Sequence, residues 1–226
     1  MITHNKIIIP NSRFGFTAYA DHYHYGEQEG SNVPFIIFVG GATEPSVYLE
    51  RMETTPDIIV KEFERIMPAT LTSADLMIVP NPMREDSDYS SDRQDFRFHL
   101  FFDLMTKTQN ARPETIGLVG YSLGAYLVTA LAFDQPQVKS VAIIGGTEMT
   151  SAVEESESVP QGKRFMVYGN GDDPLVMEAY VFMKMVIDRG LIADVELGDG
   201  GHEFNDYVKN GYVGQAFAFA LPTVKG

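Results

Sequence analysis

The chain contains no cysteine and has few basic side chains for its acidic content. The absence of cysteine excludes disulfide bonds, thiolate nucleophiles and cysteine-based zinc sites, and it leaves the redox compartment undetermined. With 17 Lys and Arg against 31 Asp and Glu, the formal net charge is -14. Such a charge opposes binding to nucleic acid phosphates or to an anionic membrane surface. We therefore expect neither a nucleic acid nor a membrane as a partner.

Long hydrophobic runs are also missing. The first ten residues contain one lysine ahead of only three consecutive isoleucines, whereas the core of a signal peptide needs about 7–15 apolar residues. No run approaches the roughly 20 apolar residues of a membrane-spanning helix. The expected location is cytoplasmic, and secretion of a mature chain is left open.

The length of the chain limits its domain organisation. At 226 residues with 44% hydrophobic content, it can bury one large core but is short for two ordinary domains. We expect residues 1–226 to form a single domain without a cap domain.

The chain does contain a regular alternation of short apolar runs and helical stretches. Residues 6–9 and 16–25, rich in β-branched and aromatic side chains, predict an antiparallel hairpin. Residues 33–39 form a near-continuous apolar run, typical of a strand buried on both faces of a parallel sheet. Further strands are predicted at residues 76–79, 116–119, 141–144, 165–168 and 193–197, and helices at residues 47–67, 95–106, 123–133, 175–188 and 204–220. This order predicts an α/β three-layer sandwich, with a mostly parallel twisted sheet, helices on both faces and an N-terminal antiparallel hairpin.

Two polar stretches separate predicted strands. Residues 147–162 are acidic and rich in serine, which predicts a surface loop. Residues 81–93 include Arg84, Tyr89 and Arg93 among acidic side chains. They either contact a substrate or form a solvated charged loop, and the sequence favours neither interpretation.

The motif GYSLG at residues 120–124 lies between an apolar strand and a helical stretch. In a G-x-S-x-G turn the chain reverses so sharply that side chains at the glycine positions would collide, and the serine is held in a strained conformation. The turn projects the Ser122 hydroxyl outward. It also leaves the Leu123 amide at a helix N-terminus, where a developing oxyanion is stabilised. Because such motifs also occur in ordinary turns, Ser122 becomes a candidate nucleophile only if a base and an acid accompany it.

Candidates for the acid and the base follow Ser122 in chain order. The loop GNGDDP contains Asp172 and Asp173, and the later loop GDGGHEF contains His202. His202 is the candidate base and Asp173 the candidate acid, with Asp172 as the alternative. Asp173 precedes a proline and is also suited to cap a helix, and the two roles can coexist. All these residues follow parallel strands at their carboxyl ends, the edge where open α/β sheets bind ligands.

These motifs resemble those of the α/β-hydrolase family over essentially the whole chain. The segments GYSLG and GGHEF are specific marks of the resemblance, and GNGDDPLV is a looser one. Because only residues 147–162 lie where lids are usually inserted, the chain is most similar to small capless esterases and dienelactone-hydrolase-like proteins. The resemblance implies a second oxyanion donor after the first parallel strand, with Gly41 favoured and Ala42 as the alternative. Val39-Gly40 stands where many relatives have His-Gly.

The expected activity is hydrolysis of a carboxylic ester with a small soluble acyl group, through an acyl-enzyme on Ser122. Thioester or peptide hydrolysis by the same triad is an alternative, as is a non-catalytic binding protein of the same fold. A small-molecule ester is the expected partner, and no cofactor is expected. His22 and His24 form an H-x-H pair, but no third ligand is evident, so no metal site is expected.

Overall fold

The computed structural model describes residues 2–11, 16–27, 33–43, 45–67, 71–82, 116–156 and 161–221. The predicted helix at residues 95–106 lies outside these ranges. So does all of the 81–93 segment beyond Pro82.

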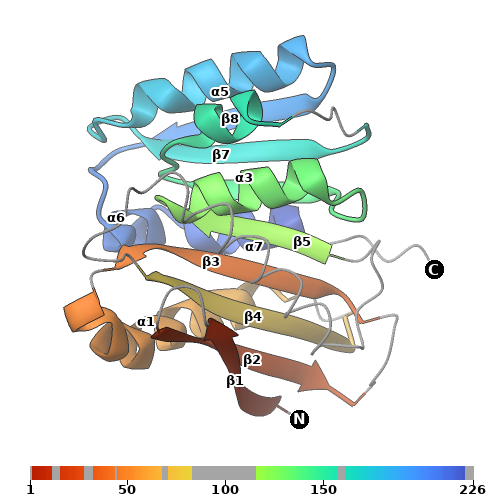
Figure 1. Cartoon of the computed structure of the whole chain (residues 1–226), viewed down its shortest axis with the longest axis vertical. Coiled ribbons are helices and arrows are strands. Elements are labelled where there is room, and N and C mark those ends of the chain that lie inside the picture. The colour runs from red at the N-terminus through yellow and green to blue at the C-terminus, as the bar shows by residue number, and fades with distance from the viewer. Residues whose placement is uncertain are drawn as a thin grey trace.

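The described residues build one eight-stranded mixed sheet in the order β1-β2-β4-β3-β5-β6-β7-β8 (Figure 1). Its strands are β1 (Ile2–Asn11), β2 (Phe16–Gly26), β3 (Phe35–Thr43), β4 (Ser73–Pro82), β5 (Ile116–Tyr121), β6 (Ser140–Ile144), β7 (Arg164–Asn170) and β8 (Ile192–Gly198). The β1–β2 and β2–β4 pairs are antiparallel, and the pairs from β4 to β8 are all parallel. The predicted N-terminal hairpin and mostly parallel sheet are confirmed.

Helices cover both faces of this sheet (Figure 1). The described helices are α1 (Pro45–Ile66), α3 (Gly124–Asp134), α4 (Met149–Glu154), α5 (Val176–Asp188), α6 (Phe204–Lys209) and α7 (Tyr212–Ala220). Side chains of α3, α4 and α5 pack into the core on one face, and those of α1, α6 and α7 into the core on the other. No helix within the described ranges combines the length and the hydropathy needed to cross a bilayer.

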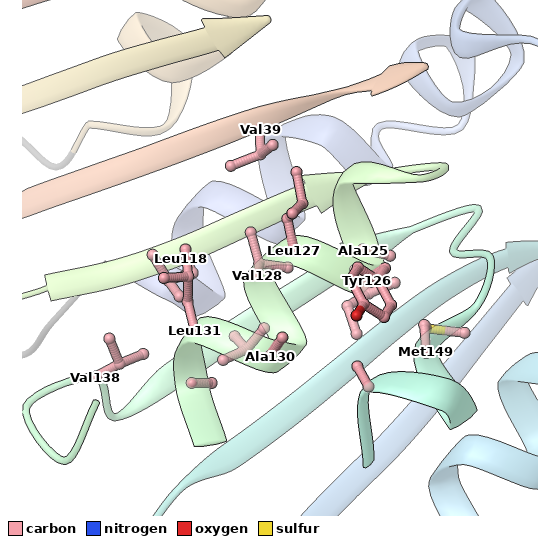
Figure 2. Close-up of a cluster of buried hydrophobic side chains, with 14 of the residues drawn as sticks. Val39, Leu118, Ala125, Tyr126, Leu127, Val128, Ala130, Leu131, Val138 and Met149 are labelled. Atoms are coloured by element: carbon pink, nitrogen blue, oxygen red, sulfur yellow. The ribbon is translucent and has the colours of Figure 1, made fainter. Parts of the chain in front are cut away.

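The central strands are apolar without interruption because both of their faces are covered. In β3, Phe35, Ile37 and Val39 belong to the core on the α3 face, and Ile36 and Phe38 to the core on the α7 face. Figure 2 shows part of the first core, where side chains of β3 and β5 meet those of α3. Ten of the eleven residues of α3 are buried, as expected for a helix that is apolar all round.

The helices differ from the sequence prediction at two places along the chain. The 147–162 segment contains the short helix α4, because Met149, Ala152 and Val153 share one helical face and are buried against the core. The predicted helix 204–220 is two helices, because Gly211 adopts a left-handed φ of 74° that interrupts the helical backbone between α6 and α7.

Candidate active site

Ser122 lies in the turn between β5 and α3 with a backbone φ of 51°. This left-handed conformation is uncommon for a residue other than glycine, and it stores strain. The Ser122 amide donates to the carbonyl oxygen of Ile144 at 3.0 Å, which anchors the turn to β6.

The two glycines of the motif permit the turn by leaving out a side chain. A Cβ atom at Gly120 would lie 2.5 Å from a methyl of Val128, and one at Gly124 would lie 2.2 Å from the carbonyl oxygen of Val39. Both distances are too short for any real side chain. The steric reason predicted for the two glycines is confirmed.

His202 reaches Ser122 from the loop between β8 and α6. Its Nε2 atom lies 2.9 Å from the Ser122 Oγ atom, within hydrogen-bond distance. The His202 side chain is 31% exposed, so the pair lies at the surface of the molecule, where a substrate can approach it.

Asp173, rather than Asp172, contacts His202. The Oδ2 atom of Asp173 lies 2.7 Å from His202 Nδ1, and the residue is 2% exposed. The Leu175 amide donates to the other carboxylate oxygen at 2.8 Å. Asp173 therefore supports the start of α5 and holds His202 at once. Asp172 is exposed, and its backbone amide bonds Gly200.

The Asp173 carboxylate is kept ionised in spite of its burial. Burial by itself raises the pKa of Asp173, but hydrogen bonds from Tyr207, His202 and the Leu175 amide, together with the charge of His202, outweigh it. The net effect lowers the pKa below its ordinary value. A carboxylate held in this state favours the His202 tautomer that donates from Nδ1 and accepts at Nε2.

Gly41 lies directly beside Ser122 because β3 bulges at this point. Val39 pairs with Val79 but Ala42 pairs with Asn81, so β3 gains one residue relative to β4. A Cβ atom added to Gly41 would lie 3.0 Å from the Ser122 Cβ atom. Ala42 lies beyond the bulge, where it pairs again with β4. The backbone of Gly41 is therefore favoured over that of Ala42 as the group beside Ser122. The predicted strand ended before these glycines, whereas β3 continues through them to Thr43.

Leu123 follows the serine and precedes the first residue of α3. The Tyr126 amide bonds the Leu123 carbonyl oxygen at 3.2 Å, so Leu123 already takes part in the first helical turn. The amides of Leu123 and Gly41 thus belong to backbone that flanks Ser122 on two sides.

Sequence reasoning missed two tyrosines at this site. Tyr207 of α6 donates a 2.6 Å hydrogen bond to Asp173, and the Tyr121 ring packs beside His202. Neither belongs to a motif position that specifies tyrosine. The only available signal for Tyr207 was its place in the apolar pattern of the helix after His202.

The H-x-H pair contacts an aspartate of a neighbouring strand. His22 Nε2 and His24 Nδ1 lie 2.8 Å and 3.0 Å from the same Asp75 oxygen. Within the described residues, no group of three or more His, Cys, Asp or Glu side chains is arranged to hold a metal ion.

No protein-family model and no curated protein sequence matches this chain. Its fold, however, is similar to those of solved esterases. A ferulic acid esterase superposes with a TM-score of 0.69 at 11% identity, covering 97% of both chains. EstE1, a thermophilic carboxylesterase cloned from a metagenomic library, gives a TM-score of 0.70 at 13% identity, covering 99% of this chain and 90% of EstE1. The S-formylglutathione hydrolase FrmB from Staphylococcus aureus gives 0.65 at 10% identity, covering 97% of this chain and 99% of FrmB.

At these identities the likeness concerns the fold. The sheet order, the strand-turn-helix at Ser122 and the superpositions together define the class: the chain has the α/β-hydrolase fold.

Proposed function

We propose that this protein is a serine hydrolase that cleaves a carboxylic ester of a small soluble substrate through an acyl-enzyme on Ser122. One observation carries the proposal: an unbroken chain of hydrogen bonds runs from Ser122 through His202 to Asp173. It begins at a strained serine at the carboxyl edge of the sheet. Strain of this kind persists where the surrounding structure imposes it, most often at functional sites.

The proposed reaction is an acyl transfer in which each group of the site has one role. His202 Nε2 accepts the Ser122 proton as Oγ attacks the ester carbonyl carbon, while Nδ1–H donates to Asp173. The carbonyl oxygen becomes an oxyanion, for which we propose the amides of Leu123 and Gly41 as donors. The imidazolium returns its proton to the departing alcohol oxygen, which leaves Ser122 acylated. A water molecule then attacks the acyl carbon, again through His202, and releases the acid and the free serine.

The esterase assignment has separate support from similar structures. Several solved structures that match this fold are described as carboxylesterases or esterases. Thioester and peptide substrates pass through the same type of intermediate, so they are tested beside the ester.

A fluorophosphonate probe gives the first test, because it reacts only with an activated serine. We expect it to label the wild-type protein at Ser122. A panel of p-nitrophenyl esters, acyl-CoA thioesters and aminoacyl amides then separates the activities, with Ser122→Ala as the blank for each. We expect ester turnover to exceed the other two. A protein that is not labelled and hydrolyses nothing on the panel would instead be a non-catalytic binding protein.

A further inference from the structure

Tyr207 is completely buried beneath the candidate active site. Its side chain is 0% exposed, and its hydroxyl donates a 2.6 Å hydrogen bond to Asp173 Oδ2. The same oxygen receives the 2.7 Å hydrogen bond from His202 Nδ1. The other oxygen, Oδ1, accepts from the Leu175 amide. Three donors of different origin therefore fix the carboxylate against rotation.

The end of β6 leaves space for this tyrosine. Gly145 has a left-handed φ of 50°, and a Cβ atom there would lie 2.5 Å from the Tyr207 hydroxyl oxygen. The Gly145 amide meanwhile bonds the Tyr168 carbonyl oxygen at 2.9 Å, which holds the glycine in place. Gly145 thus combines a left-handed conformation suited to glycine with the absence of a side chain at the point where the Tyr207 hydroxyl reaches Asp173.

We propose that Tyr207 is a positioning residue of the Ser122–His202–Asp173 site: its hydroxyl fixes the orientation of the Asp173 carboxylate and shares the oxygen that binds His202. The catalytic meaning of this role rests on the proposed function. The sharing has an electrostatic consequence, because a donor on Oδ2 withdraws part of the negative charge that would otherwise stabilise the His202 imidazolium.

The hydroxyl remains a donor over the working pH range. Burial, followed by the hydrogen bond to Asp173, raises the pKa of Tyr207 above its ordinary value. Among the described residues, the ionisable side chains that act on Asp173 are Tyr207 and His202. The Tyr121 ring makes an edge contact with the Tyr207 ring, with centroids 6.1 Å apart.

The test is Tyr207→Phe, which removes only the hydroxyl. We expect kcat to fall about tenfold with KM changed less than about twofold. We also expect the acid limb of the kcat/KM profile to move upward by roughly half a pH unit, because the imidazolium gains the full charge of Oδ2.

Tyr126→Phe is the matched control. Tyr126 is also buried and donates a hydrogen bond of the same 2.6 Å length to a carboxylate, that of Glu155. We expect its pH profile to match the wild type, although its melting temperature falls. Two results together would show that Tyr207 is merely structural. The activity of Tyr207→Phe would fall only in proportion to the fraction of protein that the fluorophosphonate labels, and its kcat/KM pH profile would match that of the wild type.

A second measurement does not depend on activity. The Nδ1–H proton of His202, which bonds Asp173 Oδ2, can be followed by proton NMR in the wild-type protein and in Tyr207→Phe. We expect its chemical shift to differ between the two proteins, because Tyr207 no longer shares the oxygen that accepts this proton. Identical chemical shifts would overturn the proposal. If the wild type hydrolyses no ester, the proposed function fails, and the NMR comparison still decides whether Tyr207 acts on the Asp173–His202 pair.

Discussion

The hydroxyl of Tyr121 donates a 2.7 Å hydrogen bond to the backbone carbonyl oxygen of His202, and the two rings stack with centroids 5.8 Å apart. The residue before the serine in the turn thereby ties β5 to the loop that carries the histidine. Because the hydrogen bond goes to the backbone, both imidazole nitrogens remain available for Ser122 and Asp173.

Replacement of the serine should remove the chemistry and leave the fold intact. Ser122→Ala keeps a small side chain with the same backbone preferences, so we expect a melting temperature close to that of the wild type. Fluorophosphonate labelling should disappear, and kcat/KM for an ester should fall by at least roughly 10³-fold. Ser140→Ala is the control, since Ser140 is a buried serine that bonds Arg164. Labelling that survives in Ser122→Ala would disprove the assignment.

The two adjacent aspartates should respond very differently to asparagine. Asp173→Asn can present an N–H group to His202 and impose the wrong tautomer, so we expect kcat to fall by at least roughly 10²-fold. Asp172→Asn alters an exposed side chain and should cost less than about tenfold. Steady-state kinetics with circular dichroism as a folding check measures both. The reverse ranking would move the acid to Asp172, and equally small effects would mean that neither orients the histidine.

Substrate preference should favour short acyl groups. Within the 147–162 segment, Met149–Glu154 form α4, whose apolar side chains are buried in the core rather than over the site. We therefore expect p-nitrophenyl acetate and butyrate to be hydrolysed faster than the laurate, with no increase in rate at a lipid interface. Faster turnover of an emulsified long-chain triglyceride than of a soluble butyrate ester would contradict this expectation.

Lys163 should make stability depend on pH in the alkaline range. It is 1% exposed and donates 2.6 Å hydrogen bonds to the carbonyl oxygens of Gln135 and Val138. Burial, with a smaller contribution from Lys139, lowers its pKa to about 8. An unfolded lysine keeps its proton up to about pH 10.4. Between about pH 8 and about pH 10.4 the unfolded state therefore binds more protons at Lys163 than the folded state does. The contribution of Lys163 to the free energy of unfolding thus rises with pH in this range.

Urea unfolding of the wild type and of Lys163→Met should show this effect. Between about pH 7 and pH 9.5, we expect the free energy of unfolding of the wild type to increase relative to that of the variant. Lys184→Met is the control, because the Lys184 side chain is 75% exposed. A difference between wild type and Lys163→Met that stays constant over this range would show that Lys163 does not titrate there.

The sequence was sufficient for the sheet because buried parallel strands leave an unmistakable pattern. The apolar run 33–39 must be covered on both faces, and the turn at residues 120–124 must lack side chains at its two glycines. Each pattern therefore allows few alternative structures. Helix α4 could not be found in the same way. Its three buried side chains, Met149, Ala152 and Val153, are surrounded by Ser, Thr and Glu that favour a loop on composition.

The choice between Asp172 and Asp173 lies beyond sequence reasoning for a different reason. Neighbouring residues in a turn point in different directions, and only the path of the chain after β7 decides which one turns inward. The role of Tyr207 depends on contacts between segments even farther apart in the sequence. Its hydroxyl reaches from α6 to Asp173 through the space left by Gly145. No local spacing encodes such a relationship.

The order of these residues along the chain also has a consequence for synthesis on the ribosome. The candidate nucleophile Ser122 follows β5, whereas the candidate base His202 lies 80 residues later along the chain and follows β8. During synthesis Ser122 therefore leaves the ribosome before the imidazole that the proposed mechanism requires. Its hydroxyl can become an activated nucleophile only after β8 and α6 have been translated and have folded against the sheet, so the proposed chemistry is delayed until that part of the fold has formed.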